Sequence, residues 1–311
     1  MKFVAIQPMQ YDHAGIVGLD GYYLVNEYKI IPCMEEKAQS SEKPSKTLIL
    51  TFPFEGIEET KGPSNKFKNN SIAATKAKKF AAWFALITDT PTRLFYSGFG
   101  RGAFFWCWHH LASDYQEAES LKPFSPDLNA PRGNYEAVSR PDFSRSKALA
   151  GAIRLPADME LLTGKLFSLP LKEQNRYHSA CLSYQYGLEV WGIYPSVSLV
   201  AFVSAIESMI TDEPNSEYCK DARRRCTLKR DISSKFRVFF ERTLAKPLPQ
   251  NLQEFLRRAY SNRSSYVHRA LMGEFGLVVY QDFTETLQLY SELGQLSELV
   301  RAGLIQWLVE I

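Results

Sequence analysis

The strongest indication of the fold of the second half of the chain is the segment Pro195-Ser-Val-Ser-Leu-Val-Ala-Phe-Val-Ser-Ala-Ile-Glu-Ser-Met-Ile-Thr211. It is apolar nearly all round, a pattern typical of a helix buried at the centre of a helical bundle. Serines and Glu207 interrupt it, so no window reaches the roughly 18 uninterrupted apolar residues of a membrane-crossing helix. We therefore expect a central helix in a globular domain.

Four further segments of the second half show an apolar face at helical spacing. These segments predict helices over 171–190, 231–244, 250–260 and 282–311. The last is expected as one long helix or as a pair broken near Gly294 and Gly303. The second half is thus expected to be all-α.

The first half of the chain mixes strand and helix patterns. Runs of β-branched and aromatic residues bounded by Pro and Gly predict strands, and an apolar helical face ahead of Pro91 predicts one helix. The expected strands cover 3–6, 21–33, 46–54, 93–96 and 103–108, and the helix covers 71–88 after a loop over 55–71. Residues 113–146 hold four prolines and little periodicity, which predicts a long connection.

These patterns predict the α+β class, with a mixed α/β domain over residues 1–165 followed by an all-α domain over residues 166–311. Gly164 and Pro170 bracket the change of composition at this boundary. The 311 residues are 45% hydrophobic and 23% charged, which excludes a largely disordered chain.

Cysteine usage and the N-terminal residues predict the compartment. The five cysteines are odd in number and scattered, which favours free thiols in a reducing cytoplasm over a disulfide framework. Met1–Gln10 lacks the basic start and the long apolar run of a signal peptide. We expect a cytoplasmic protein that does not cross a membrane.

Positive charge is concentrated in Lys220–Arg269, which holds 14 Lys and Arg against four Asp and Glu. This segment carries a net charge of +10, and because the whole chain carries +3, the rest sums to −7. A basic surface attracts polyanions, since each phosphate that it neutralises releases condensed counterions. Two interpretations stay open: a polyanion site, or solvated helix faces paired with the acidic remainder of the chain.

Within the basic segment, Tyr260-Ser-Asn-Arg-Ser-Ser-Tyr-Val-His268 places Arg263 and His268 five positions apart. A guanidinium neutralises charge that develops on a phosphoryl group, and an imidazole titrates near neutrality and moves protons. RNA supplies its own nucleophile, the 2′-hydroxyl, so this chemistry needs no metal-activated water. The pair is a candidate for metal-free cleavage of a phosphodiester.

Two arrangements would bring Arg263 and His268 into one pocket. On one straight helix the two positions lie about 140° apart around the axis, so they do not face the same way. A break at Ser261-Asn262 or Ser264-Ser265, residues that cap or interrupt helices, would change this. Alternatively, two copies of the chain would bring the two residues together across a symmetric interface.

Arg263-x4-His268 resembles the Arg-x(4–6)-His signature of the HEPN superfamily. Ala201–Ile210, with Glu207 embedded in it, resembles the apolar helix that precedes the signature in the ApeA-like branch. Phe255–His268 resembles the signature helix of that branch, and the similarity covers about residues 173–311.

This resemblance implies an all-α, HEPN-like helical bundle that dimerises, with the motifs of two protomers in one composite site. Active members are metal-independent endoribonucleases, often toxins or effectors of antiviral defence. Carried over, His268 is the general acid and base and Arg263 is the phosphate and transition-state ligand. Glu207 either orients Arg263 from the neighbouring helix or is a buried carboxylate paired to it structurally.

The residues around the motif are expected to contact the substrate. The residue after the Arg is often Asn, Asp or His in the superfamily, and Ser264, polar but shorter, stands there. The expected substrate-binding residues are Asn262, Ser264, Tyr266, Arg258 and Arg269.

The resemblance also predicts partners. We expect RNA, a second copy of this chain, and an antitoxin or regulatory protein, without a cofactor. The first domain would serve as a sensor, an inhibitory cover or an RNA-specificity module. Two other functions stay open: a non-catalytic HEPN module that binds RNA or nucleotide, and a scaffold whose basic segment meets an acidic partner.

Phe105-Trp-Cys-Trp-His-His110 raises the question of a metal. Strand alternation would put Cys107 and His109 on one face, but no second cluster offers further ligands at a recognisable spacing. We expect an aromatic strand and no metal site. Gly98-x-Gly-x-Gly102 is interpreted as a tight turn between strands rather than a phosphate cradle.

Overall fold

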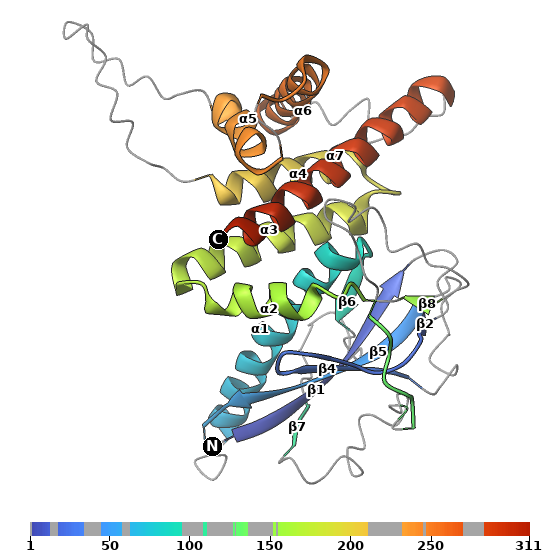
Figure 1. The fold of residues 1–311 in the computed structure, drawn as a ribbon, viewed down its shortest axis with the longest axis vertical. Helices are drawn as coiled ribbons and strands as arrows, with labels where there is room; N and C mark the ends of the chain where they lie inside the picture. The colour runs from blue at the N-terminus through green and yellow to red at the C-terminus, as the bar shows by residue number, and fades with distance from the viewer. Residues whose placement is uncertain are drawn as a thin grey trace, which may run out of the picture. The chain divides into compact units, whose positions relative to one another are not determined.

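The structure, a computed structural model, describes residues 2–12, 18–33, 45–57, 63–94, 108–110, 127, 129–135, 152–153, 155–210, 232–244, 247–269 and 283–311. The chain forms two compact units, Met1–Ser168 and Leu169–Ile311. In the described residues, every strand belongs to the first unit and five of the helices to the second (Figure 1), so the fold class is α+β.

The first unit is built on an antiparallel sheet with a long central strand. Its strands are β1 (Lys2–Asp12), β2 (Gly18–Leu19), β3 (Tyr23–Val25), β4 (Tyr28–Pro32), β5 (Ser45–Glu55), β6 (Thr92–Leu94), β7 (Trp108–His110) and β8 (Ala152–Ile153). β1 pairs with β5 over its whole length, from Lys2 opposite Glu55 to Asp12 opposite Ser45. The strand order is β3-β4-β5-β1-β6, and β7 also pairs with β1; β2 and β8 form a separate parallel pair.

The strand expected over 21–33 is a hairpin in the structure. β3 and β4 pair antiparallel, with Val25 opposite Tyr28. The turn between them places Asn26 at φ 54°, in the left-handed region. Asparagine tolerates this backbone at little cost, which explains how the chain reverses at Asn26-Glu27.

Helix α1 (Pro63–Thr88) packs on the sheet (Figure 1). A side-chain hydrogen bond joins α1 to helix α2 (Met159–Ser168). Tyr28 of β4 stacks on Phe80 of α1 with ring centroids 4.2 Å apart. The buried Trp83 of α1 donates its indole N–H to Thr163 Oγ1 of α2 at 2.8 Å. These contacts form the core of the first unit.

The second unit consists, in the part that the structure describes, of five helices. They are α3 (Leu171–Val190), α4 (Pro195–Met209), α5 (Ile232–Thr243), α6 (Gln250–Arg269) and α7 (Phe283–Glu310). α3 and α4 are joined by a short turn, and α4 contacts α3, α5, α6 and α7. The expectation that Pro195–Thr211 forms a central helix is therefore confirmed, with Phe202, Val203 and Ile206 fully buried.

Two expected element boundaries were wrong, and of the two arrangements expected for 282–311 the single long helix is found. The loop expected over 55–71 contains the first turns of α1, which begins at Pro63; Pro is favoured there because the first turn needs no N–H donor. α6 continues past Tyr260 to Arg269. α7 is one helix, because Gly294 and Gly303 pack against Trp191 and against Phe239 and Phe240 instead of ending it. In the described residues, none of the helices has the length and hydropathy needed to cross a membrane.

Candidate functional site

Helices α4 and α6 bring Glu207 and Arg263 together. Arg263 Nη2 lies 2.6 Å from Glu207 Oε2, and the Tyr260 hydroxyl donates to Glu207 Oε1 at 3.2 Å. Tyr260 and Arg263 are three positions apart, so they project from the same side of α6. One carboxylate on α4 therefore holds two donors from α6, and the three residues form a polar cluster between two helices that otherwise meet through apolar side chains.

The ion pair is only partly open to solvent, since each side chain keeps 20% of its surface exposed. A charge-assisted hydrogen bond of this length is strong and fixes the orientation of the guanidinium. The Nε atom of Arg263 is buried and has no hydrogen-bond partner among the residues that the structure describes.

The break that one chain would need between Arg263 and His268 does not occur. α6 runs from Gln250 to Arg269 without interruption, since Ser and Asn each lower helix stability by well under about 1 kcal/mol relative to Ala. The buried Phe255, Leu256 and Ala259 also anchor the helix to its neighbours. Positions 263 and 268 thus lie about 140° apart around the axis. The broken-helix arrangement is wrong, and the two-copy arrangement stays a prediction.

Several expected site residues are placed only in part. His268, Tyr266 and Arg269 belong to the last turns of α6, and their side chains lie outside the described residues. Ser264 is half-buried on the same helix. The Arg and Lys residues at 220, 223–225, 229 and 230, which supply much of the basic segment, also lie outside the described residues.

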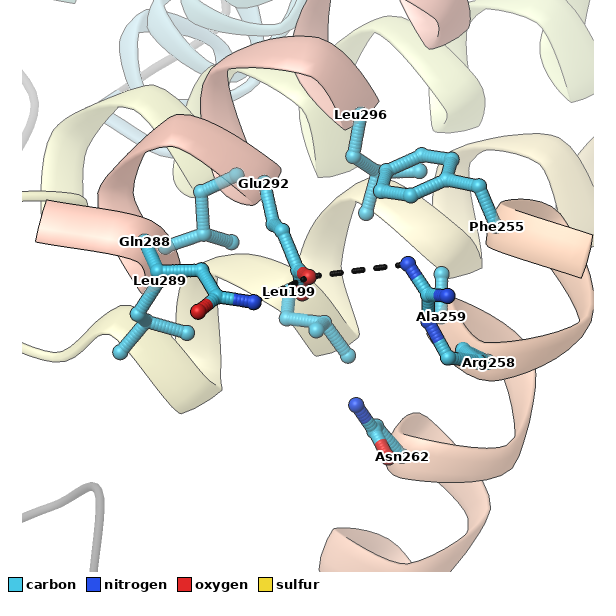
Figure 2. Close-up of a pocket in the computed structure, with 10 residues that line it drawn as sticks. Leu199, Phe255, Arg258, Ala259, Asn262, Gln288, Leu289, Glu292 and Leu296 are labelled. Atoms are coloured by element: carbon cyan, nitrogen blue, oxygen red, sulfur yellow. Dashed lines mark hydrogen bonds and ion pairs between the residues drawn. The ribbon is translucent and has the colours of Figure 1, made fainter. Parts of the chain in front are cut away.

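Arg258 and Asn262 line a groove between α6 and α7, which we call the α6–α7 groove (Figure 2). They are four positions apart on α6, so they share one side of the helix. Arg258 Nη2 lies 3.6 Å from Glu292 Oε1 of α7. The structure thus divides the expected site residues of α6 into two groups, one at Glu207 and one in the groove.

Three residues of these two groups were not predicted from the sequence: Tyr260, Gln288 and Glu292. The spacing in the sequence could have indicated Tyr260, because a residue three positions before Arg263 lies on the same side of a helix. No such spacing indicates Gln288 and Glu292, since their role depends on which side of α7 packs beside α6. That packing involves residues about 30 positions apart in sequence, and no local pattern encodes it.

The described residues show no metal site, and the thiol of Cys181 is not reactive. In the described part of the chain, no group of three His, Cys, Asp or Glu side chains is placed to hold a metal ion; Cys107 and the side chain of His109 lie outside it. Burial raises the pKa of the Cys181 thiol, which disfavours the reactive thiolate. Cys181 is therefore a packed residue of α3.

Comparisons with protein-family models, with curated proteins and with solved structures return no match for this chain.

Proposed function

We propose that this chain is a metal-independent endoribonuclease of the HEPN type that acts as a homodimer. The resemblance of residues 173–311 to the ApeA-like branch supplies the reaction. The single observation that supports it best is the cluster of Arg263, Glu207 and Tyr260, because it holds the Arg263 guanidinium 2.6 Å from the Glu207 carboxylate, which also accepts from the Tyr260 hydroxyl. In a cell, such an activity would serve as a toxin or as an effector of antiviral defence.

The proposed reaction is an attack of the RNA 2′-hydroxyl on the adjacent phosphorus. His268 accepts the hydroxyl proton as the P–O2′ bond forms, and a protonated His268 donates to the 5′-oxygen as the P–O5′ bond breaks. Arg263 neutralises the charge that grows on the phosphoryl oxygens. The products are a 2′,3′-cyclic phosphate and a 5′-hydroxyl, and the reaction consumes no water in this step.

The continuity of α6 supports the proposed dimer. Because positions 263 and 268 lie about 140° apart on one helix, a site that needs both residues requires the second from another copy. A two-fold axis would then build two equivalent sites, each with the Arg263 of one copy and the His268 of the other.

The proposal is tested with purified full-length chain and single-stranded RNA in EDTA. We expect cleavage, with 2′,3′-cyclic phosphate ends identified by mass spectrometry. His268→Ala is expected to lower the rate about 10²- to 10⁴-fold, because it removes the general acid and base. Undiminished cleavage by a folded His268→Ala chain would overturn the assignment. Salt-dependent RNA binding by the wild-type chain without product would indicate the non-catalytic module instead.

Glu207 is expected to act as a positioning residue. Glu207→Ala removes the acceptor that orients Arg263 and should lower kcat about tenfold to a hundredfold with little change in KM. Glu207→Gln keeps an acceptor of the same shape and should recover much of that loss. Glu254→Ala, at an exposed position on α6, is the control. If Glu207 had only a structural role, both variants would have a lower melting temperature than the wild-type chain, but kcat of the folded protein would be unchanged.

A further inference from the structure

The α6–α7 groove is a cavity of about 310 Å³ within the second unit. Figure 2 shows Arg258 and Asn262 on α6 facing Gln288 and Glu292 on α7, with Leu199 of α4 between the two helices. Known small-molecule sites have volumes of about 300–1,000 Å³. The groove therefore suits one small ligand or one unit of a polymer, and is too small for a helix of a partner protein.

The lining of the groove has an apolar floor and a polar rim. Leu199, Phe255 and Leu296 supply the floor; Phe255 and Leu199 are buried, at 6% and 7% exposure. A flat aromatic ligand would gain contact area against such a floor, including an aromatic contact with the Phe255 ring. An extended, strongly hydrated ligand would gain little.

The rim offers both donors and acceptors of hydrogen bonds. The side-chain amides of Asn262 and Gln288 each carry an oxygen acceptor and two N–H donors. The edges of nucleobases carry complementary donors and acceptors, and unpaired bases are read in this way by many RNA-binding proteins. Gln288 Nε2 already donates to Glu292 Oε1 at 3.5 Å, and a saturated apolar ligand, such as an acyl chain, would offer no partner to the remaining donors and acceptors of the two amides.

The ion pair at the rim of the groove is weak. Arg258 and Glu292 are 3.6 Å apart, with 60% and 36% of their side chains exposed. A pair this exposed contributes little to stability, so an incoming phosphate can replace the carboxylate as the partner of Arg258. Base and phosphate contacts would then come from one side of α6.

The groove and the proposed catalytic cluster share α6 at similar heights along its axis. Asn262 precedes Arg263 in sequence, and Ala259, in the groove wall, lies one turn before Arg263 on the same helix. Around the axis, Arg258 lies about 140° and Asn262 about 100° from Arg263. A strand that contacts both the groove and Arg263 would therefore pass around α6.

We propose that the α6–α7 groove is a subsite for one unpaired nucleobase of a single-stranded RNA, on the same helix as Arg263. The choice of RNA as the ligand rests on the proposed function. The assignment of the groove rests on its size, its apolar floor and its two amides. The subsite would select single strands, because a base inside a duplex cannot enter it.

Binding is measured with chains that all carry His268→Ala, so that no RNA is consumed. The probes are a labelled single-stranded RNA hexamer, its duplex, and an abasic hexamer with the same backbone, compared by fluorescence anisotropy at low salt. The hexamer is expected to bind at least about tenfold more tightly than the other two, since each stacked base adds binding energy. Equal binding of the hexamer and the abasic strand would overturn the subsite.

Matched variants test whether the base-dependent part of the binding comes from the groove. Asn262→Ala and Gln288→Ala are each expected to weaken binding of the hexamer about fivefold to tenfold and to leave binding of the abasic strand unchanged. Asn251→Ala and Gln295→Ala make the same changes at exposed positions of the same two helices outside the groove, and should bind the hexamer like the parent chain. All four positions are exposed, so the variants should fold.

The outcomes separate this inference from the proposed function. Loss of base-dependent binding in the groove variants alone, together with no cleavage by the wild-type chain, would support the subsite and overturn the nuclease. Cleavage by the wild-type chain with equal binding by all four variants would support the nuclease and overturn the subsite.

Discussion

Replacing Arg263 with Ala is expected to lower the rate of RNA cleavage about 10³-fold or more. A fixed guanidinium that meets the transferring phosphoryl group contributes rate factors of about 10³ to 10⁵ in phosphoryl-transfer enzymes. Arg263 is held in place by Glu207 at 2.6 Å. Its position needs no reorganisation during the reaction, which is the condition under which such electrostatic stabilisation is largest.

Arg263→Lys separates the charge from the shape of the side chain. The ammonium of Lys keeps the charge but lacks the planar fork that binds a carboxylate and a phosphate at the same time. We expect Lys to restore less than about a tenth of the lost rate. Arg257→Ala removes the same charge at a more exposed neighbouring position of α6 and should cleave RNA at nearly the wild-type rate.

Loss of stability must be distinguished from loss of catalysis. Arg263→Ala leaves the partly buried Glu207 with Tyr260 as its remaining partner among these residues, and an unsatisfied group costs about 1–3 kcal/mol. The melting temperature of each variant is therefore measured first, and rates are compared well below it. A folded Arg263→Ala chain that cleaves RNA at the wild-type rate would contradict the role given to Arg263.

The same variant tests the composite site. When inactive Arg263→Ala and His268→Ala chains are mixed and re-equilibrated, half of the dimers should contain one chain of each kind. One of the two sites in each mixed dimer then holds an intact Arg263 and an intact His268, so about a quarter of the wild-type activity should return. If both residues act within one chain, the mixture stays inactive.

The helices of the second unit could be predicted because each carries its own signal. The apolar run at Pro195–Thr211 has no polar side for solvent, and in the structure α4 contacts four other helices. The expected span of residues 171–190 coincides with α3. Such elements are encoded locally, by hydrophobic spacing and by Pro at their starts.

The candidate site could be predicted only in part, because its geometry depends on long-range packing. The sequence indicated that Glu207 neighbours Arg263, through the resemblance, and the structure places the two in contact. The serines around Arg263 suggested a break, but tertiary contacts of Phe255 and Ala259 keep α6 helical. The groove formed with α7 depends on the relative rotation of two helices, which no residue pattern specifies.

Replacing Phe202 with Ala is expected to cost the second unit about 3–5 kcal/mol of unfolding free energy. Phe202 is fully buried on α4, with the rings of Tyr184 and Trp191 at centroid distances of 5.4 and 5.8 Å. It also lies so close to α3 that a side-chain carbon at Gly187 would be 2.5 Å from Phe202 Cε1. Two helices fixed this closely cannot collapse onto the space that Ala leaves, so the cost falls in the range of large core truncations.

Hydrogen exchange read by mass spectrometry measures this loss for each unit separately. Amides of α3 and α4 should exchange about 10²- to 10⁴-fold faster in Phe202→Ala, because their exchange requires opening of the destabilised unit. Amides of α1, in the other unit, are the internal reference. Val197→Ala, on the same helix at a position 38% exposed, should change exchange little. Unchanged protection of α3 and α4 in Phe202→Ala would show that the α3–α4 contact does not stabilise this unit. The position of α4, which carries Glu207, would then have to be fixed by its contacts with other helices.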